Sequence, residues 1–283
     1  MIKNSAQPLW RKVAYHFNNY GPPLRPCEED ICIMEKAVAK WANRYPDQKF
    51  RAALWGVTPE IAGMSWPEGT ELLAFEKSEE MIREVWPGDI DGFRKARCCN
   101  WLDTFSVIKN PVSTVIGDCC FNLHRFPGDW RALFVAAYRV LKEQGVFIMR
   151  FFMRSGNRES SGNVFKELME NKIKNLHLFK LRLIMSLQED VRQGVRHHDI
   201  WQAWKNASID MAKLIKVTGW TKELISIMEL FEGINTRVSY PTHMELKPIF
   251  SDIFKEIDMT IPEYEKGECC PIMVFRKRMR NGS

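Results

Sequence analysis

Residues 51–56, RAALWG, form a short apolar run that ends in a glycine, and residues 57–62, VTPEIA, follow with the signals of a helix start. Thr58 is a good N-cap residue, Pro59 suits the first helical position, and Glu60 favours the positive end of a helix. A strand is therefore predicted to pass directly into a helix. The free backbone N–H groups at that helix start would be available to a ligand's carboxylate.

The chain around this stretch alternates between apolar runs and helical patterns. This alternation is typical of a parallel sheet with helices on both faces. After residues 51–56, further strands are expected at residues 71–76, 96–99, 112–117 and 146–152, and helices between them at 78–86 and 129–143. A helix at residues 248–254 and two edge strands, antiparallel to each other, are expected at the end of the chain, the strands at 254–261 and 271–278.

Four regions are expected along the chain of 283 residues. The region 155–240 has mostly helical patterns and is too long for a simple connection, so we expect a cap inserted into the fold. In that cap, Trp201, Trp204, Met211 and Ile215 are expected to share one helical face. The regions are an N-terminal helical segment (1–50), a Rossmann-like cofactor-binding core (51–154), the helical cap for substrate (155–240), and a C-terminal helix with edge strands that completes the core (241–283).

An acidic residue ends the second expected strand. Glu76 lies twenty positions after Gly56, and an acid at about this distance, at the tip of strand two, is placed to accept hydrogen bonds from ribose hydroxyls. Each residue alone also has a structural interpretation, with Gly56 as a turn glycine and Glu76 as a solvated strand end. Their joint occurrence with the strand order favours the binding role.

With these features, residues 50–154 resemble the class I S-adenosylmethionine-dependent methyltransferases. The resemblance implies an α/β fold with a Rossmann-like, mostly parallel seven-stranded sheet flanked by helices, and S-adenosyl-L-methionine as the cofactor. It implies that Gly56, Val57 and Thr58 line the methionine part of the cofactor. It also implies that Glu76 binds the ribose and that Lys77 lies near the adenine.

The resemblance extends to the residues after the third and fourth strands. Asn100 would hydrogen-bond the adenine amino group, and Trp101 would cover the ring, with plain core packing as the alternative for Trp101. Gly117, Asp118 and Cys119 match the motif that lies beside the cofactor's methyl group. The cofactor-binding set implied by the resemblance thus includes Asp118 and Cys119.

The sequence departs from the family pattern in the first loop. Leu54 and Trp55 stand where the family usually has an acid, and Gly56 is the loop's single glycine. Non-glycine side chains there would contact the cofactor or change how it sits. Asn100 also replaces a more usual acid.

Two residues are candidates for a catalytic base, which is needed only if the acceptor must lose a proton. Asp118 is the nearest by motif position. His124 follows on the same loop and belongs to a residue type that titrates near neutral pH; an exposed loop position is its alternative. Arg25, in the connector before the fold, would close over the cofactor or substrate carboxylate as a bidentate donor, or would lie on the surface.

Composition limits the function classes. The chain has 41 Lys and Arg against 35 Asp and Glu, a net charge of +6. The excess lies between residues 172 and 222, where we expect a solvated helix face, with attraction of an anionic substrate as the alternative. A nucleic-acid binder usually has a stronger basic excess, so nucleic acid is not expected as a partner. The eight cysteines lack metal-site or disulfide spacing, so reduced thiols and no metal are expected.

No apolar stretch approaches the ~20 residues that a membrane helix needs. Residues 1–10 lack the apolar region of a signal peptide. We therefore expect a cytoplasmic protein without membrane contact, either monomeric or homodimeric.

The predicted function is in-line methyl transfer from S-adenosylmethionine to a small-molecule acceptor that is anionic or aromatic. Two alternatives remain open. One keeps the cofactor but changes the chemistry to cyclisation or to transfer of another arm. The other is a non-catalytic, methyltransferase-like binding protein.

Overall fold

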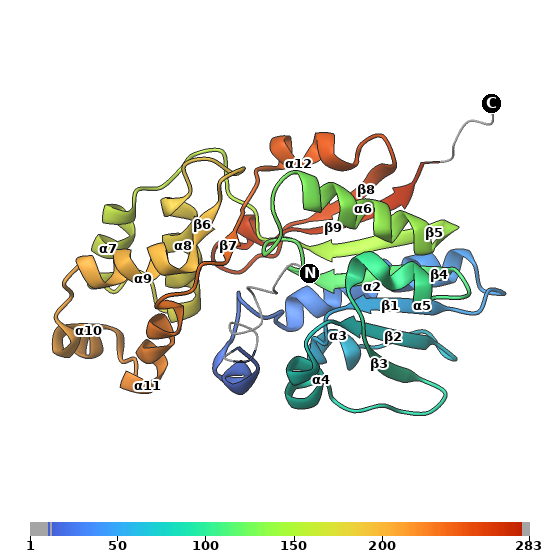
Figure 1. Ribbon diagram of the computed structural model, residues 1–283, viewed down its shortest axis with the longest axis horizontal. Coiled ribbons are helices and arrows are strands. Elements are labelled where there is room, and N and C mark those ends of the chain that lie inside the picture. Colours follow the sequence, from blue (N-terminus) through green and yellow to red (C-terminus); the bar gives the residue numbers. More distant parts are fainter. Residues whose placement is uncertain (1–10, 12, 279–283) are drawn as a thin grey trace.

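The computed structural model describes residues 11 and 13–278 and contains a seven-stranded sheet with helices packed against it (Figure 1). The strands lie in the order β3-β2-β1-β4-β5-β9-β8. The first five pair in parallel, and β9 runs antiparallel to both of its neighbours. The expected Rossmann-like, mostly parallel seven-stranded sheet is confirmed. Its strands are β1 (Arg51–Trp55), β2 (Glu71–Glu76), β3 (Arg94–Cys98), β4 (Val112–Asp118), β5 (Leu141–Arg150), β8 (Phe254–Thr260) and β9 (Ile272–Lys277).

Helices flank this sheet and connect its strands. They are α2 (Glu28–Arg44), α3 (Pro59–Ala62), α4 (Glu79–Val85), α5 (Thr104–Val107), α6 (Gly128–Val140) and α12 (His243–Phe250), with the short 3-10 helices η1 (Phe17–Asn19), η2 (Trp101–Asp103) and η4 (Gly267–Cys269). The expectation that no signal peptide is present concerns residues 1–10, which lie outside the described residues.

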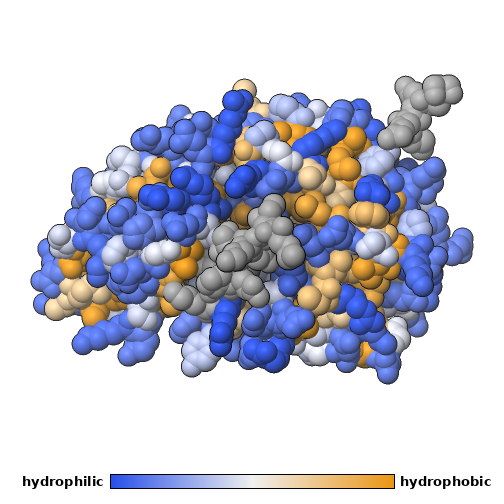
Figure 2. All heavy atoms as spheres, in the orientation of Figure 1, coloured by the Kyte–Doolittle hydropathy of each residue, from blue (hydrophilic) through white to orange (hydrophobic). Residues whose placement is uncertain are grey.

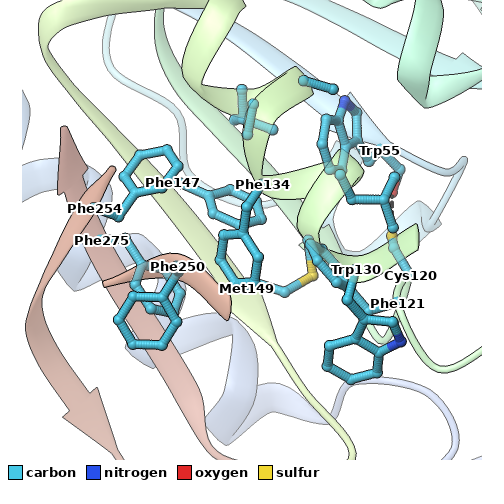
Figure 3. Close-up of a cluster of buried hydrophobic side chains, with 14 of the residues drawn as sticks. Trp55, Cys120, Phe121, Trp130, Phe134, Phe147, Met149, Phe250, Phe254 and Phe275 are labelled. Carbon is cyan, nitrogen blue, oxygen red and sulfur yellow. Dashed lines mark hydrogen bonds between the residues drawn. The ribbon is translucent and has the colours of Figure 1, made fainter. Parts of the chain in front are cut away.

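Alternate residues of each central strand enter two different cores. Ala53 and Trp55 of β1 belong to one hydrophobic cluster, and Ala52 and Leu54 belong to another. This is the period of two that places successive side chains on opposite faces of a sheet. The first cluster is rich in aromatic side chains from β5, β9, α6 and α12 (Figure 3). The central strands are therefore buried on both faces, as their near-continuous apolar sequences require.

The region expected to form a cap lies beside the carboxyl ends of the strands, on the left in Figure 1. It has its own hydrophobic cluster. Its elements are α7 (Ser161–Met169), α8 (Leu176–Leu187), α9 (His197–Asn206), α10 (Met211–Thr218), α11 (Lys222–Ile225), η3 (Ser226–Phe231), and the paired strands β6 (Val195–Arg196) and β7 (Arg237–Val238).

The structure corrects parts of two expectations in this region. Most basic residues of 172–222 are exposed, as expected for a solvated helix face, but Lys180 and Arg182 lie on α8, of which every residue except Leu187 is buried. Trp201 and Met211 were expected to share a helical face, yet they lie on α9 and α10. The side chain of Asp210 accepts a hydrogen bond from the amide of Ala212 and so starts a second helix.

Several element boundaries also differ from the sequence prediction. β5 begins at Leu141 rather than at residue 146, and α6 ends at Val140. The early part of β5 is irregular, with a register shift against β4 between Val112 and Thr114. The helix α12 begins at residue 243 because Thr242 and Glu245 form a capping box, and Pro248 lies within it.

The surface in Figure 2 is mainly hydrophilic, with hydrophobic residues interspersed rather than gathered in one patch. Within the described part of the chain, no helix has the length and apolar character to cross a membrane.

Candidate functional site

A cavity lies between the carboxyl ends of the strands and the cap. The sheet order reverses between β1 and β4, and in open α/β sheets ligands bind outside the carboxyl ends of the strands at such a point. Three parts of the chain line the cavity. The sheet contributes Trp55, Gly56, Val57, Thr58, Glu76, Asp118 and Cys119, the N-terminal connector contributes Phe17, Tyr20 and Arg25, and the cap contributes Lys180, Ile184, His197, Phe231 and Val238.

The first loop shapes the floor of the cavity. Gly56 has φ +93°, which is a conformation that a residue with a side chain rarely adopts. Its N–H donates to the carbonyl of Phe75 on β2, at 2.9 Å, which holds the loop against the neighbouring strand. Thr58 precedes α3 as expected, but its side chain makes no capping hydrogen bond. The loop therefore presents backbone and a hydroxyl to the cavity.

Glu76 is buried at the tip of β2 and lines the same cavity. Its Oε1 accepts a hydrogen bond from the amide of Ser78 at 2.9 Å, which fixes the direction of the carboxylate. Burial raises the pKa of Glu76. Met81 and Val85, one turn apart on α4, line the cavity beside it. These two apolar residues were not predicted, although their spacing of four places them on one helix face.

Asp118 lines the cavity and forms an ion pair with Arg150, which does not line it. Arg150 Nε donates to Asp118 Oδ1 at 2.6 Å, and its Nη1 lies 3.2 Å from Asp30 Oδ2. Both Arg150 and Asp30 are completely buried. Tyr264 donates its hydroxyl to Asp30 at 3.0 Å and completes the cluster. The geometry therefore gives Asp118 a buried structural partner in Arg150, and its role as a base stays a prediction.

Of the three residues predicted to lie near the adenine, Trp101 lines the cavity, whereas Asn100 and Lys77 lie on the surface. Trp101 lines the cavity, donates its Nε1–H to the carbonyl of Phe75, and stacks on Trp55 with 14° between the rings. Asn100 is exposed, does not line the cavity, and accepts the Leu102 amide to start η2. The side chain of Asn100 thus lies outside the cavity lining, and its adenine contact stays a prediction. Lys77, also assigned to the adenine, is likewise exposed and outside the cavity lining.

His124 is not part of the cavity lining. It packs against Trp101, with 5.7 Å between the ring centroids. Burial lowers the pKa of His124 to about 4, so the imidazole is neutral at neutral pH. His124 therefore does not face a ligand in this cavity directly, and its role as a base stays a prediction.

Arg25 lines the cavity, as predicted for a residue of the connector, but it is bound within the chain. Its Nε and Nη2 lie 2.8 and 2.6 Å from Glu60 Oε1 on α3. The guanidinium also lies over the ring of Phe17, 4.2 Å from its centroid. Arg25 thus fixes the connector to the helix that follows β1, rather than presenting a free fork to a cofactor carboxylate.

The sequence predicted that the cap would hold substrate, but it did not single out Lys180 among the residues on the cap side of the cavity. The polar groups of the cap side are Lys180 on α8, His197 at the start of α9, and Tyr240 after β7, together with Tyr20 of the connector. The sequence does contain a signal for the burial of Lys180. The apolar residues of α8 are distributed around the whole helix, and such a helix is buried. A lysine in the middle of that pattern is therefore a buried charge.

The thiols at the cavity fit the expected role of packing groups. All eight cysteines are free. Burial is the main cause that raises the pKa of Cys119 and of Cys120 well above the usual value, and the charge of Asp118 adds to it. Neither is a thiolate at neutral pH, and the thiolate is the reactive form. Among residues 11 and 13–278, no group of three or more His, Cys, Asp or Glu side chains is placed to hold a metal ion.

No family model and no curated protein matches this sequence. Solved structures do match. One is provisionally named as a Zn-dependent alcohol dehydrogenase from Rhodobacter sphaeroides: it is 10% identical, 99% of this chain and 100% of that chain are covered, and the TM-score is 0.60. Another is the magnesium protoporphyrin IX methyltransferase ChlM from Synechocystis PCC 6803 with bound SAH: it is 10% identical, the coverage is 98% and 100%, and the TM-score is 0.52.

At this identity the likeness shows a shared fold. The strand order separates two versions of that fold, because classic dinucleotide-binding domains have the order 3-2-1-4-5-6. Here the strand beside β5 is the reversed β9. The chain therefore has a Rossmann-like fold that the magnesium protoporphyrin IX methyltransferase shares, as the resemblance of residues 50–154 implied.

Proposed function

We propose that this protein binds S-adenosylmethionine at the carboxyl ends of β1 and β2 and transfers its methyl group to a small molecule held under the cap. One observation carries the proposal: a single cavity joins the loop at Gly56 and the acid Glu76 to cap residues such as Lys180 and Ile184. Methyl transfer requires two ligands in line in one space, and this cavity has a wall suited to each.

The sheet side of the cavity fits the three parts of the cofactor. The buried carboxylate of Glu76 is placed to accept hydrogen bonds from ribose hydroxyls. Met81, Val85 and Trp101 offer apolar and aromatic surface to an adenine ring. The positive-φ Gly56 lets the backbone approach the methionine part closely. When bound, the cofactor supplies a methyl group already activated by the adjacent sulfonium.

The cap and connector supply the acceptor side. Ile184, Phe231 and Val238 give it an apolar surface that suits a small organic molecule and excludes water. Arg25 holds the connector on α3 through Glu60, so the third wall of the cavity is anchored to the cofactor loop. An acceptor held in this way loses little further freedom on reaching the line of transfer, and such alignment lowers the barrier.

Calorimetric titration of S-adenosylmethionine and S-adenosylhomocysteine tests the proposal. The wild type should bind both, and Glu76→Ala should bind each about tenfold or more weakly, the loss of a charge-assisted hydrogen bond. The matched control is Glu79→Ala, which removes an exposed carboxylate from the neighbouring helix α4 and should bind as the wild type does. A well-folded wild type that binds neither ligand would overturn the proposal in favour of a non-catalytic binding protein.

Product analysis separates methyl transfer from other chemistry on the same cofactor. S-adenosylhomocysteine as the product indicates methyl transfer, and methylthioadenosine indicates cyclisation or transfer of another arm. The cap cavity favours methyl transfer, because cyclisation of the cofactor needs no second ligand and would leave the apolar surface of Ile184 and Phe231 without use.

A further inference from the structure

The buried helix α8 contains two basic residues that the structure treats differently. Arg182 donates two hydrogen bonds to Glu159, one of them at 3.1 Å, and one to Glu167 at 2.6 Å. Lys180, only 6% exposed, has no carboxylate within 4.0 Å of its Nζ among residues 11 and 13–278. A buried cation without a partner is costly. Two carboxylates neutralise the charge of Arg182, whereas Lys180 has no carboxylate in that position among the described residues.

The surroundings of Lys180 point its amine into the cavity. It lines the cavity, with Nζ 4.3 Å from the ring centroid of Phe231 and 4.8 Å from that of Tyr20. The other titratable groups near it are His177 on α8 and His197 on α9, and no acid is among them. An aromatic ligand would therefore find a basic nitrogen between two ring faces.

The protonation states of these groups suit proton transfer. Burial lowers the pKa of Lys180 to about 7 and the pKa values of His177 and His197 to about 4. Burial also raises the pKa of Tyr20 to about 12. At neutral pH the two histidines and Tyr20 are uncharged, so Lys180 is the group in this part of the cavity that changes charge near pH 7.

We propose that Lys180 is the catalytic base for an acceptor of the phenol class, taking the proton from an aromatic hydroxyl as its oxygen accepts the methyl group. This inference rests on the proposed function. In the step, the O–H proton moves to the lone pair of Lys180 Nζ. The oxygen's electron pair forms the new bond to the methyl carbon, and the pair of the broken carbon–sulfur bond stays on sulfur. The products are an aryl methyl ether, the thioether form of the cofactor and a lysine ammonium, which returns its proton to solvent.

The chemistry of the cavity selects a phenol over other acceptors. A phenol has an ordinary pKa of about 10, within reach of an amine base, whereas an aliphatic hydroxyl is far less acidic. A carboxylate is already ionised and needs no base. The rings of Tyr20 and Phe231 provide surface for an aromatic acceptor.

The test uses 4-nitrophenol, whose neutral and ionised forms absorb at different wavelengths, at a pH where the free probe is mostly neutral. Wild type saturated with S-adenosylhomocysteine should bind the probe in its ionised form. Lys180→Met should bind it about tenfold more weakly, and as the neutral phenol. The control Lys213→Met removes an exposed lysine of α10 and should behave as the wild type.

Three outcomes of the 4-nitrophenol titration would overturn the proposal: no binding by wild type, a neutral bound probe, or an ionised bound probe that persists in Lys180→Met. Tighter binding of 4-nitrobenzoate than of 4-nitrophenol would also overturn it and indicate a carboxylate acceptor. Titrating S-adenosylhomocysteine into Lys180→Met shows that the variant is folded. Failure of S-adenosylhomocysteine to bind the wild type would contradict the proposed function. In that case the 4-nitrophenol titration is repeated without S-adenosylhomocysteine, and it still tests Lys180.

Discussion

Arg150 Nε lies 2.6 Å from Asp118 Oδ1, which joins the end of β4 to the end of β5 behind the ligand cavity. The second carboxylate on this guanidinium, Asp30, comes from α2, so one buried side chain ties together the N-terminal helix and two neighbouring strands. The cavity wall at Asp118 is therefore fixed by charge from outside the cavity.

Arg150→Met should strongly destabilise the fold. It leaves the carboxylates of Asp30 and Asp118 without their cation, and breaking a buried pair in this way costs about 3–5 kcal/mol. The free energy of unfolding from urea titration measures the loss. Lys95→Met, which removes the exposed pair with Asp91, is the control and should change stability by about 0–1 kcal/mol. Equal effects in the two variants would refute the structural role of Arg150.

Cofactor affinity should fall as the pH decreases, because Glu76 must be ionised to accept two hydroxyl hydrogen bonds. Burial raises the pKa of Glu76, so protonation occurs at a higher pH than for an exposed glutamate. Calorimetry of S-adenosylhomocysteine from about pH 7 to about pH 5 should show weakening in the wild type and little change in Glu76→Gln. Parallel pH profiles for the two proteins would exclude Glu76 as the group responsible.

Arg25 and Glu60 should be energetically coupled, and the coupling should extend to ligand binding. The pair is partly exposed, with side chains 20% and 24% accessible, so a double-mutant cycle with alanine should give about 1 kcal/mol. Arg25→Ala should also weaken cofactor binding, because the connector that carries Phe17 and Tyr20 loses its anchor on α3. If Glu60→Ala lowers stability but leaves cofactor affinity unchanged, the pair only stabilises the fold.

The sequence predicted the sheet because its signals are local. Of the first four strands, β1, β2 and β4 are short apolar runs, Gly56 and Glu76 mark the ends of β1 and β2, and Thr58 and Pro59 mark the start of α3. These features depend on neighbours within a few residues. For the same reason the boundary at Leu141 was missed, since the register shift opposite it depends on a partner strand.

The site was only partly predictable, because its electrostatics depend on residues distant in sequence. Arg150 and Asp30 are 120 positions apart, and no local pattern pairs them. The excess of basic residues between 172 and 222 predicted solvated helices, yet two of these residues lie on the buried helix α8: Arg182, which pairs with Glu159 and Glu167, and Lys180, which forms no ion pair within residues 11 and 13–278. Charge counts along a chain do not distinguish these environments, which are set by packing.

Lys180→Met should stabilise the protein, and the gain should depend on pH. In the folded state the pKa of Lys180 is about 7, against 10.5 for an ordinary lysine. Between these values the unfolded chain binds more protons than the folded one, so wild-type stability rises with pH through that window. Below about pH 7 the full cost of the buried charge is present, on the order of 5 kcal/mol at about 1.4 kcal/mol per pKa unit, partly offset by the ring contacts of Tyr20 and Phe231.

The stability difference between Lys180→Met and wild type should therefore be largest near pH 6 and should decrease towards pH 10, as measured by urea unfolding at each pH. In the folded state His177 and His197, with pKa values of about 4, and Tyr20, with a pKa of about 12, do not titrate within this window. Their titration in the unfolded chain is common to both proteins and cancels from the difference. Lys213→Met should show no such pH dependence. A variant less stable than wild type at every pH would mean that the ammonium stabilises the fold, and Lys180 would then lack the readily lost proton that a base requires.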